Sequence, residues 1–420
     1  DWGSLDTVTT VAFYGGISGS ISGTFTAANS PYVVSGDIYV DEDDSLTIEA
    51  GVVFKFFGSY DMDIVGYMYA VGTVQDSIHF RPYYMSIPTR GMWGGITLIY
   101  ANNAKQVTMS YFSIAYGGSN AHAYSALAIR DRHSGEGTHI SHGDIYGSRG
   151  RGVTVQYNYY GPSGNADGAW QDVKLSYLNI HHNNSYGLYD HWNYYADVVY
   201  DHLDIHDNDS YGLFVDCHYY PVSLDITNST IQNNNSTEVY VSYFNHTGID
   251  LEFHMNNNTI TDDDNNYLVQ LYGLHYGELV DFRLNNWGSA VTDSMNSGTN
   301  PQDIDAFYDW YEVDIYPRVN YAGYVGATGT SGYTADLAFL DENGNQLESV
   351  TGNSDSLILE VFDADLTGSG TVTVTVTSLS DNSGETVTLS ESNSGQFLGS
   401  VALNHGTFRI IEDIDDYNND

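Results

Sequence analysis

The sequence predicts an all-β protein in which a parallel β-helix is followed by a small antiparallel β-sandwich. The first observation behind this prediction is a repeat, since Ile180, Ile205 and Ile231 occupy equivalent places in similar segments at intervals of 25 and 26 residues. The second is that apolar residues alternate before each Ile, as in Val173–Ile180, and polar residues follow it, so each repeat contains short strands and sharp corners. A period of this length without helix-forming segments is typical of a β-solenoid.

Successive coils of a β-helix lie about 4.8 Å apart, so residues of equal phase form ladders along it. An apolar ladder is expected inside the helix, made of Ile114, Ile145, Ile180, Ile205, Ile231 and Ile260. A second ladder, of Asn183, Asn208 and Asn234, is expected at a corner. There the amide side chains would satisfy backbone groups that the strands leave unpaired.

Residues 1–36 are rich in Gly, Ser and Thr and predict an N-terminal strand or cap segment, because the open end of a solenoid exposes strand edges. The β-helix itself is expected over residues 37–320. Within it, Ser45–Phe56, the Trp-Gly-Gly-Ile run that ends at Ile96, and Asn286–Gly288 resemble the opening and closing coils of a known family. This family comprises the secreted bacterial right-handed parallel β-helix proteins of the pectate-lyase-like superfamily. The resemblance implies a right-handed helix but no single activity, because the superfamily contains lyases, hydrolases, epimerases and adhesins.

The composition changes after Tyr321, where short segments of alternating residues are separated by turn signals. These segments are Leu337–Leu340, Leu357–Phe362, Thr371–Thr377, Thr386–Leu389 and Gln396–Val401. Short alternating strands at this density are typical of an immunoglobulin-like antiparallel sandwich. This module is therefore expected over residues 321–412, and the acidic residues 413–420 are expected to form a tail or linker.

Acidic residues dominate the charge of the chain, with 54 Asp and Glu against 12 Lys and Arg and a net charge of −42. Such a field repels nucleic acids and anionic membranes, so nucleic acid is excluded as a partner. No apolar run approaches the length of a membrane span, so membrane insertion is not expected. The chain begins with Asp1 rather than Met, as a mature exported protein would. We therefore expect an extracellular or cell-surface location rather than the cytoplasm of a salt-adapted cell.

A group of cations could carry the chemistry of a polysaccharide lyase. In a β-helix, positions about one coil apart stack, so these cations could neutralise a uronate carboxylate while a base removes the C5 proton. The candidates are Arg130, Arg132, His133, Arg149, Arg151 and Tyr157. Alternatively, the arginines form ion pairs with acids on a long insertion, and these acids are Asp131, Glu136 and Asp144.

Histidines and acids are the candidates for metal binding. His181 and His206 each follow an inward Ile, however, and are expected to point outward in a solvated ladder that Gln232 and Thr261 continue. Acidic clusters could hold Ca²⁺ through carboxylate oxygens, and their members are Asp61, Asp63, Asp262, Asp263 and Asp264. None of these clusters has the spacing of a calcium-binding loop, so no metal or cofactor is expected to be required.

Tyrosine is unusually frequent, with 37 residues, many of them at expected outward or loop positions. These include Tyr157, Tyr159, Tyr160, Tyr194, Tyr195, Tyr219, Tyr220, Tyr240 and Tyr243. Tyrosine presents an apolar face and a polar tip, which suits sugar rings or the surface of another protein.

Seven Asn-x-Ser/Thr sequences could carry glycans if the cell has an N-glycosylation system. Asn-rich corners followed by Ser or Thr would also produce such sequences by chance. They begin at Asn183, Asn208, Asn228, Asn234, Asn235, Asn245 and Asn257.

Two classes of function follow from these observations. The favoured one is a non-catalytic extracellular surface protein, either an adhesin or a subunit of a surface filament or layer. Its partners would be copies of itself, other surface proteins or carbohydrate, and an N-terminal strand added to a neighbour's sheet edge would build a fibre. The alternative is a secreted lyase or glycoside hydrolase acting on an acidic polysaccharide, which a charge of −42 repels unless Ca²⁺ bridges the two.

Overall fold

Two compact units are distinguished in the computed structural model of the chain. Unit 1 contains Asp1–Val280 and Ala306–Arg318, and unit 2 contains Asp281–Asp305 and Val319–Asp420. The structure describes residues 15–99, 106–119, 124–130, 137–156, 171–191, 196–217, 223–243, 252–262, 267–273, 279–298, 302–327, 336–340, 356–363, 366, 368–378, 381–393 and 396–402.

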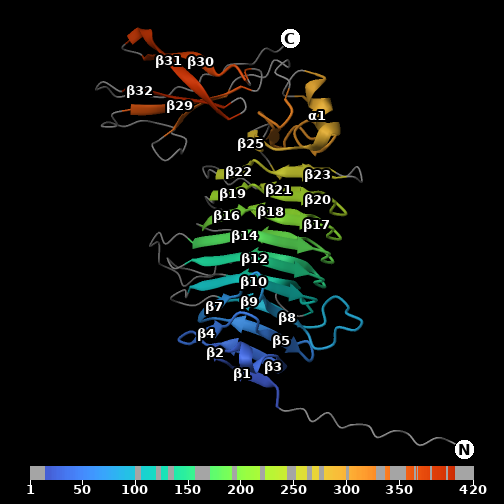
Figure 1. Cartoon of the computed structure of the whole chain (residues 1–420). Helices are drawn as coiled ribbons and strands as arrows, with labels where there is room; N and C mark the ends of the chain where they lie inside the picture. Colours follow the sequence, from blue (N-terminus) through green and yellow to red (C-terminus); the bar gives the residue numbers. More distant parts are fainter. Residues whose placement is uncertain are drawn as a thin grey trace, which may run out of the picture. The chain divides into compact units, whose positions relative to one another are not determined.

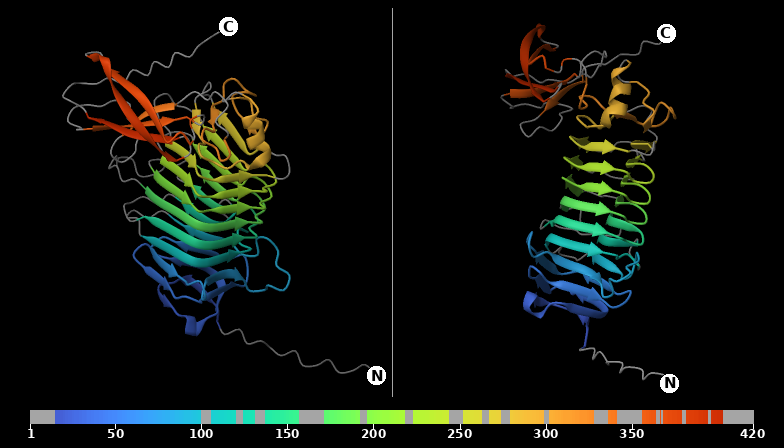
Figure 2. Two further views of the ribbon diagram at one scale, coloured as in Figure 1. Left: turned by 45° about the horizontal axis from the view of Figure 1, so that its top comes forward. Right: turned by 45° about the vertical axis from the view of Figure 1, so that its right-hand side comes forward.

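Unit 1 is a parallel β-helix, because its described strands pair in parallel with their counterparts one coil earlier and one coil later. Figure 1 and Figure 2 show these coils as a stack of aligned arrows. The strands lie on three faces. A short 3₁₀ helix, η1 (Ala27–Asn29), lies at the corner between β2 on face 1 and β3 on face 2.

Face 1 contains the strands that begin most of the coils. These are β2 (Gly23–Phe25), β4 (Ser45–Ile48), β7 (Tyr67–Val71), the first halves of β10 (Val107–Ala115), β12 (Thr138–Tyr146) and β14 (Gln171–His181), then β16 (Ala196–Asp201), β19 (Ser223–Thr227) and β22 (Glu252–Asn256). Beyond them, β25 (Leu279–Asp281) and β27 (Arg318–Asn320) span the division between the units.

Face 2 contains the second halves of β10, β12 and β14 together with shorter strands. These are β5 (Val53–Phe56), β8 (Ile78–Pro82), β17 (Asp204–His206), β20 (Thr230–Gln232) and β23 (Thr259–Thr261). The first half of β3 (Tyr32–Val40) also lies on face 2, whereas its second half pairs with β1 and β6 on face 3. Face 3 contains β1 (Ile17–Ser20), β6 (Asp61–Ile64), β9 (Gly95–Leu98), β11 (Ser125–Arg130), β13 (Arg151–Gln156), β15 (Leu188–His191), β18 (Leu213–Cys217), β21 (Val239–Tyr243), β24 (Val269–Gly273) and β26 (Phe307–Tyr308).

Two strands of the first coil come from the segment that the sequence assigns to an N-terminal strand or cap. Strand β1 pairs in parallel with β3, and β2 pairs in parallel with β4. The described part of this segment therefore continues the stack as its first coil.

The apolar ladder predicted inside the helix is confirmed. Ile180 pairs with Ile145 on one side and Ile205 on the other, and Ile205 pairs with Ile231. The ladder continues to Ile114 and Ile260, and all its members are at most 1% exposed. Removing this apolar surface from water is the main favourable term that holds the coils together.

The asparagine ladder is also confirmed, and its side chains are buried. The Oδ1 atom of Asn208 accepts hydrogen bonds from the backbone N–H of Asn183 at 3.1 Å and from the Nδ2 atom of Asn183 at 2.9 Å. Asn234 receives the same pair of bonds from Asn208 at 3.1 and 2.9 Å. At the far end the ladder meets Glu238, whose Oε1 accepts the backbone N–H of Asn234 at 2.9 Å. The ladder thus satisfies backbone donors at successive corners.

A glycine column lies directly beside the asparagine ladder. A Cβ atom on Gly212 would lie 2.6 Å from Nδ2 of Asn234 and 2.7 Å from the carbonyl oxygen of Glu238. Gly187 and Gly152 have equivalent contacts with Asn208 and Asn183 of the next coil. The recurring glycine seven residues after Ile180 and Ile205 is therefore required by the amide that occupies the space of its missing side chain.

Replacing Gly212 by Ala is expected to lower the free energy of unfolding by about 2 kcal/mol, because overpacking against buried backbone and amide atoms forces both to move. Urea unfolding followed by circular dichroism measures the change. Gly15→Ala is the matched control, since nothing lies within 4 Å of a Cβ at Gly15. Equal midpoints for the two variants would contradict this account of the glycine column.

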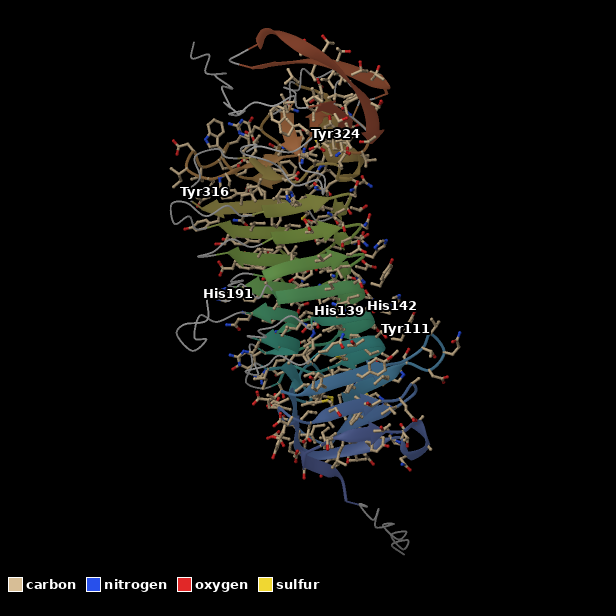
Figure 3. The ribbon with its side chains drawn as sticks, turned by 90° about the vertical axis from the view of Figure 1, so that its left-hand side faces the viewer. Tyr111, His139, His142, His191, Tyr316 and Tyr324 are labelled. Atoms are coloured by element: carbon tan, nitrogen blue, oxygen red, sulfur yellow. The ribbon has the colours of Figure 1, made fainter. Side chains whose placement is uncertain are left out.

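In six described coils the turn from face 1 to face 2 lies at a non-glycine residue with a positive φ angle. These residues are Tyr111, His142, Tyr177, His202, Asn228 and Asn257. The left-handed conformation costs a non-glycine residue about 1 kcal/mol. The four aromatic rings among these residues, from Tyr111 to His202, stack on one another with centroid distances of 4.4, 4.8 and 4.5 Å. Figure 3 shows Tyr111 and His142 next to each other at this corner. Ring stacking therefore offsets part of the conformational strain.

Unit 2 contains one described α-helix, α1 (Gly288–Asn296), and a five-stranded antiparallel sheet. The order of its strands is β28 (Asp336–Leu340), β29 (Ser356–Phe362), β32 (Gln396–Ala402), β31 (Asp381–Asn393) and β30 (Thr371–Ser378). Leu359, Leu389 and Phe397 are fully buried on its apolar face. The predicted fold class, an all-β chain with a parallel β-helix followed by a small antiparallel β-sandwich, is therefore confirmed. Within the described residues no helix is long and apolar enough to cross a membrane.

Candidate functional site

A ladder of aromatic side chains follows the outer side of face 3. Tyr189, Phe214 and Tyr240 occupy the same register position on β15, β18 and β21. The ring of Phe214 stacks on that of Tyr240 with a centroid distance of 4.4 Å and an interplanar angle of 14°. Tyr186 and Tyr211, from the preceding corners, contact these rings at 5.1 to 5.4 Å. We call these five residues the aromatic ladder.

The rings of the aromatic ladder largely cover one another. The pairs Tyr186–Tyr189, Tyr186–Phe214 and Phe214–Tyr240 are stacked at 14° to 24°, so these rings turn faces toward one another. Tyr211 instead meets Phe214 and Tyr240 edge to face, at 76° and 62°. At one end of the ladder the guanidinium of Arg151 lies 3.7 Å from the ring centroid of Tyr189. Burial raises the pKa of Tyr189 to about 12, although the nearby Arg151 lowers it. The ladder therefore adds stacking and cation–π stabilisation, and burial keeps the hydroxyl group of Tyr189 protonated.

A second group of tyrosines lies further along the same face and differs in ring orientation. Its members, which we call the open tyrosines, are Tyr267, Tyr272, Tyr308 and Tyr316. The rings contact one another at 5.0 to 6.2 Å, but the interplanar angles are 59° to 61°. An edge-to-face pair uses only one face of one ring, so the remaining ring faces of this group are not covered by the pairs themselves. Tyr267 and Tyr272 are 39% and 37% exposed.

The aromatic ladder and Tyr308 of the open tyrosines share one register position on successive strands of face 3. Gln270 on β24 occupies the ladder position between Tyr240 and Tyr308, and its Oε1 lies 3.4 Å from Oγ1 of Thr237. Figure 3 shows His191 and Tyr316 on the same side of the stacked coils. The side chain of His191 stacks on Tyr189 at 5.3 Å and contacts Oδ2 of Asp216 through its Nδ1 at 2.8 Å. One aromatic surface with polar groups at its margin therefore extends over several coils.

The pKa shifts in this surface have a common cause. Burial raises the pKa of Tyr240 to about 12, and the neighbouring Tyr211 and Tyr272 raise it further. Burial also raises the pKa of Tyr316. These phenols stay neutral at physiological pH, so they offer hydroxyl groups that both donate and accept hydrogen bonds.

The cations that the sequence grouped as lyase candidates are distributed over two ends of the strands. Arg151 begins β13 and pairs in register with Ser125, whereas Arg130 ends β11 and pairs with Gln156. Arg130 and Arg151 are thus five positions apart along the strands, roughly 17 Å. Arg149 lies 6.0 Å from the ring of Tyr124. Arg132, His133 and Tyr157 lie outside the described residues.

The acidic candidates for Ca²⁺ are partly described. Asp61 and Asp63 occupy β6 opposite Gly95 and Thr97 of β9, and Asp262 follows β23. Asp263 and Asp264 lie outside the described residues. In the described part of the chain, no group of three or more His, Cys, Asp and Glu side chains is arranged to hold a metal ion.

The outward histidine ladder on face 2 has the predicted register. His181 pairs with His206, and His206 pairs with Gln232, which pairs with Thr261. The rings of His181 and His206 stack at 5.0 Å with an interplanar angle of 1°. Nε2 of His181 lies 3.0 Å from Oδ1 of Asp144, so Asp144 is a hydrogen-bond partner of the histidine ladder.

Burial divides the glycosylation candidates. Asn183, Asn208 and Asn234 are at most 1% exposed and their amides are engaged in the asparagine ladder, so the folded coils exclude glycans at these three positions. The described candidates with exposed side chains are Asn228, Asn235 and Asn257. Asn245 lies outside the described residues.

The open tyrosines are functional candidates that sequence reasoning did not single out. Of the tyrosines named from the sequence, Tyr240 belongs to the aromatic ladder and Tyr243 ends β21. The remainder, Tyr157, Tyr159, Tyr160, Tyr194, Tyr195, Tyr219 and Tyr220, lie outside the described residues. The available signal was the continuation of the ladder phase from Tyr240 through Gln270 to Tyr308, which requires the register between β21, β24 and β26.

Comparison with known proteins adds little to this geometry. No protein-family model matches the chain, and no curated protein matches it. Among solved structures, the chain is similar to the crystal structure of the Dettilon tailspike protein (gp208), with 10% sequence identity and a TM-score of 0.32 over 91% of this chain and 86% of that chain. A similarity at this level carries no argument about function, and the fold assignment depends on the strand pairing described above.

Proposed function

We propose that this chain is an extracellular, non-catalytic surface protein that binds carbohydrate through the open tyrosines. The observation that supports this most directly is the exposure of Tyr267 and Tyr272, at 39% and 37%, within a group of tyrosines whose rings meet at about 60°. Sugar rings present apolar C–H faces, and these stack on the flat faces of aromatic side chains. Neutral phenol groups at the rim supply hydrogen bonds to the sugar hydroxyls.

The net charge of the chain limits the class of polysaccharide that it can bind. A molecule of net charge −42 repels polyanions at moderate ionic strength, because the repulsion extends over a Debye length of roughly 10 Å. Arg151, which lies at one end of the aromatic ladder, already has its guanidinium against the ring of Tyr189. These features favour an uncharged polysaccharide over an acidic one.

The same geometry bears on the enzymatic alternative. An eliminating base must lose its proton near the working pH, but the pKa of Tyr189 beside Arg151 is about 12. Arg130 is also separated from Arg151 by the length of a strand. Both observations weigh against a lyase centre built from the described cations, and a binding role remains the proposal.

Replacing both Tyr272 and Tyr316 by Ala is expected to weaken glycan binding about tenfold or more, because each lost stacking contact contributes on the order of 1 kcal/mol. Arrays of neutral and acidic polysaccharides identify the ligand, and isothermal titration calorimetry then gives its dissociation constant. Tyr69→Ala is the matched control, since Tyr69 is 56% exposed on a different face.

Three results would contradict this proposal. The first is an absence of binding to every polysaccharide tested, and the second is an equal loss of affinity in Tyr69→Ala. The third is turnover of a bound polysaccharide, detected as new reducing ends or as absorbance of an unsaturated product, which would replace the non-catalytic role by the enzymatic one.

A further inference from the structure

Strand β30 forms one edge of the sheet in unit 2. In the strand order of this sheet β30 comes last, and within the described residues it pairs with β31 alone. Figure 1 shows β30 beside β31. An edge strand carries a row of backbone N–H and C=O groups that can pair with a further strand.

The sequence of β30 has almost none of the features that protect an edge. Thr371–Ser378 contains no charged residue, no proline and no glycine, although the chain as a whole contains 54 acids. Natural edges are usually blocked by charges, proline or bulges, and here the register with β31 shifts only near the end, between Val376 and Ser378. The opposite edge strand, β28, has five residues and begins with Asp336.

The apolar face of the sheet is only partly covered at β30. Val372, Val374 and Val376 pack against the core of the sheet but are only partly buried, whereas Leu389 on β31 is fully buried. Thr371, Thr373 and Thr375 alternate with these valines. An added strand with apolar residues at every second position would therefore bury the margin of the core and complete the hydrogen-bonding ladder.

The chain contains a segment with this pattern. Thr7–Phe13 reads Thr-Val-Thr-Thr-Val-Ala-Phe, and no charged residue occurs between Asp6 and Asp37. Val11 and Phe13 are two residues apart, as an alternating strand requires. The segment lies outside the described residues.

We infer that the β30 edge of one copy of this chain binds Thr7–Phe13 of a second copy as an added β-strand. The main chain supplies hydrogen bonds along β30, and Val11 and Phe13 supply the apolar contacts beside Val374 and Val376. This inference does not depend on carbohydrate binding.

The attachment of the segment explains why the partner is a second copy. Phe13 is four residues from Ile17 in β1, so it lies within about 14 Å of the first coil. Ten successive pairings on face 3 separate β1 from β26, which is about 48 Å of stacked coils. The chain passes into unit 2 after Val280 and again after Arg318. The segment is therefore tethered far along the chain's own β-helix from these crossings, and a neighbouring molecule supplies the edge.

Such a contact joins two different surfaces of the same protein. Head-to-tail contacts of this kind leave one β30 edge and one N-terminal segment unoccupied at the two ends of the assembly. Each added copy therefore presents a new binding surface. The expected assembly is an open filament rather than a closed dimer.

Disulfide trapping between separately purified variants tests the inference. In a Cys217→Ser background, which removes the single native cysteine, one preparation carries Ala12→Cys and the other carries Thr375→Cys, because Ala12 alternates with Val11 and Phe13 as Thr375 alternates with Val374 and Val376. After mixing and mild oxidation, a disulfide-linked pair containing one molecule of each is expected on a non-reducing gel. Ala12→Cys mixed with Tyr69→Cys, which places the thiol on an exposed site of unit 1, is the control that should remain unlinked.

Each outcome of this experiment decides something. Linkage of Thr375→Cys to itself would replace the N-terminal segment by the β30 of a second copy, and an absence of any linkage above the control would overturn the inference. In a chain carrying both cysteines, a disulfide that forms only within single molecules at all concentrations would also overturn it. Circular dichroism confirms that each variant is folded.

A second measurement avoids any change in the folded units. Val11→Pro removes a backbone donor from the segment, and electron microscopy with analytical ultracentrifugation should show loss of filaments and of large species. Ser4→Pro, outside the segment, should leave assembly unchanged. Filaments of equal length in the two variants would contradict the inference, whereas carbohydrate binding by monomers of Val11→Pro would leave the proposed function intact.

Discussion

Asn208→Ala is expected to destabilise the β-helix by about 3–5 kcal/mol, which is the range for breaking a buried hydrogen-bond network. The Oδ1 atom of Asn208 accepts two bonds from Asn183, and its Nδ2 lies 2.9 Å from Oδ1 of Asn234 and 3.1 Å from the carbonyl oxygen of Ile180. Truncation therefore leaves a buried backbone N–H of Asn183 without its acceptor. An unsatisfied buried donor loses its full hydration energy.

Urea unfolding monitored by circular dichroism measures this effect, and hydrogen exchange should locate it in the coils next to Asn208. The matched control is Asn235→Ala, because Asn235 is exposed in the following coil and is expected to change stability by less than about 0.5 kcal/mol. If both variants unfolded at the same urea concentration, the asparagine ladder would not be a major source of stability.

Glu238 is expected to give the β-helix a stability that falls as the pH rises. Burial raises the pKa of Glu238 to about 8 from an ordinary value of 4.5, although hydrogen bonds from Asn234 lower it. Between these two values the folded state holds a proton that the unfolded state has released, so stability decreases with pH in this window. The contribution is fully present below about pH 4.5 and is lost as the pH rises through 8, with a total on the order of 5 kcal/mol.

The variant Glu238→Gln isolates this contribution, because its amide does not titrate. At pH 5 the variant is expected to be less stable by about 1 kcal/mol, since the Gln amide presents N–H groups where Glu238 accepts a bond from Nδ2 of Asn234 at 2.5 Å. The measured quantity is the difference in unfolding free energy between the two proteins at pH 5, 7 and 9. This difference should shrink or change sign as the pH rises, and a constant difference would refute a titrating Glu238.

The inner ladders could be predicted because they repeat at the length of one coil. Ile180, Ile205 and Ile231 keep the same phase, and a stack of parallel strands places equal phases on top of each other. The glycine seven residues after the Ile was visible in the sequence, but its cause was not. Only the structure shows that the amide of Asn208 fills the space beside Gly187.

The end of the asparagine ladder shows where a periodic pattern stops being informative. Gly212 aligns with Glu238 in the pairing of β18 with β21, so a glutamate occupies a place where the preceding coils have glycine. Its two oxygens accept the donors of Asn234 that would otherwise meet another asparagine. Nothing in the sequence around Glu238 distinguishes it from the other acids of the chain.

What the sequence determined by itself was the solenoid, its apolar interior, its asparagine corner and the outward register of His181 and His206. Each of these depends on contacts between equal phases of neighbouring coils, which a repeat of near-constant length imposes. Only the tertiary structure decided that the rings of Tyr272 and Tyr316 meet at 61° and that Arg130 lies a strand length from Arg151. It also decided that β30 is an edge strand of its sheet. The physical reason is that these arrangements depend on insertion lengths, side-chain orientation and sheet order, and no local period fixes any of the three.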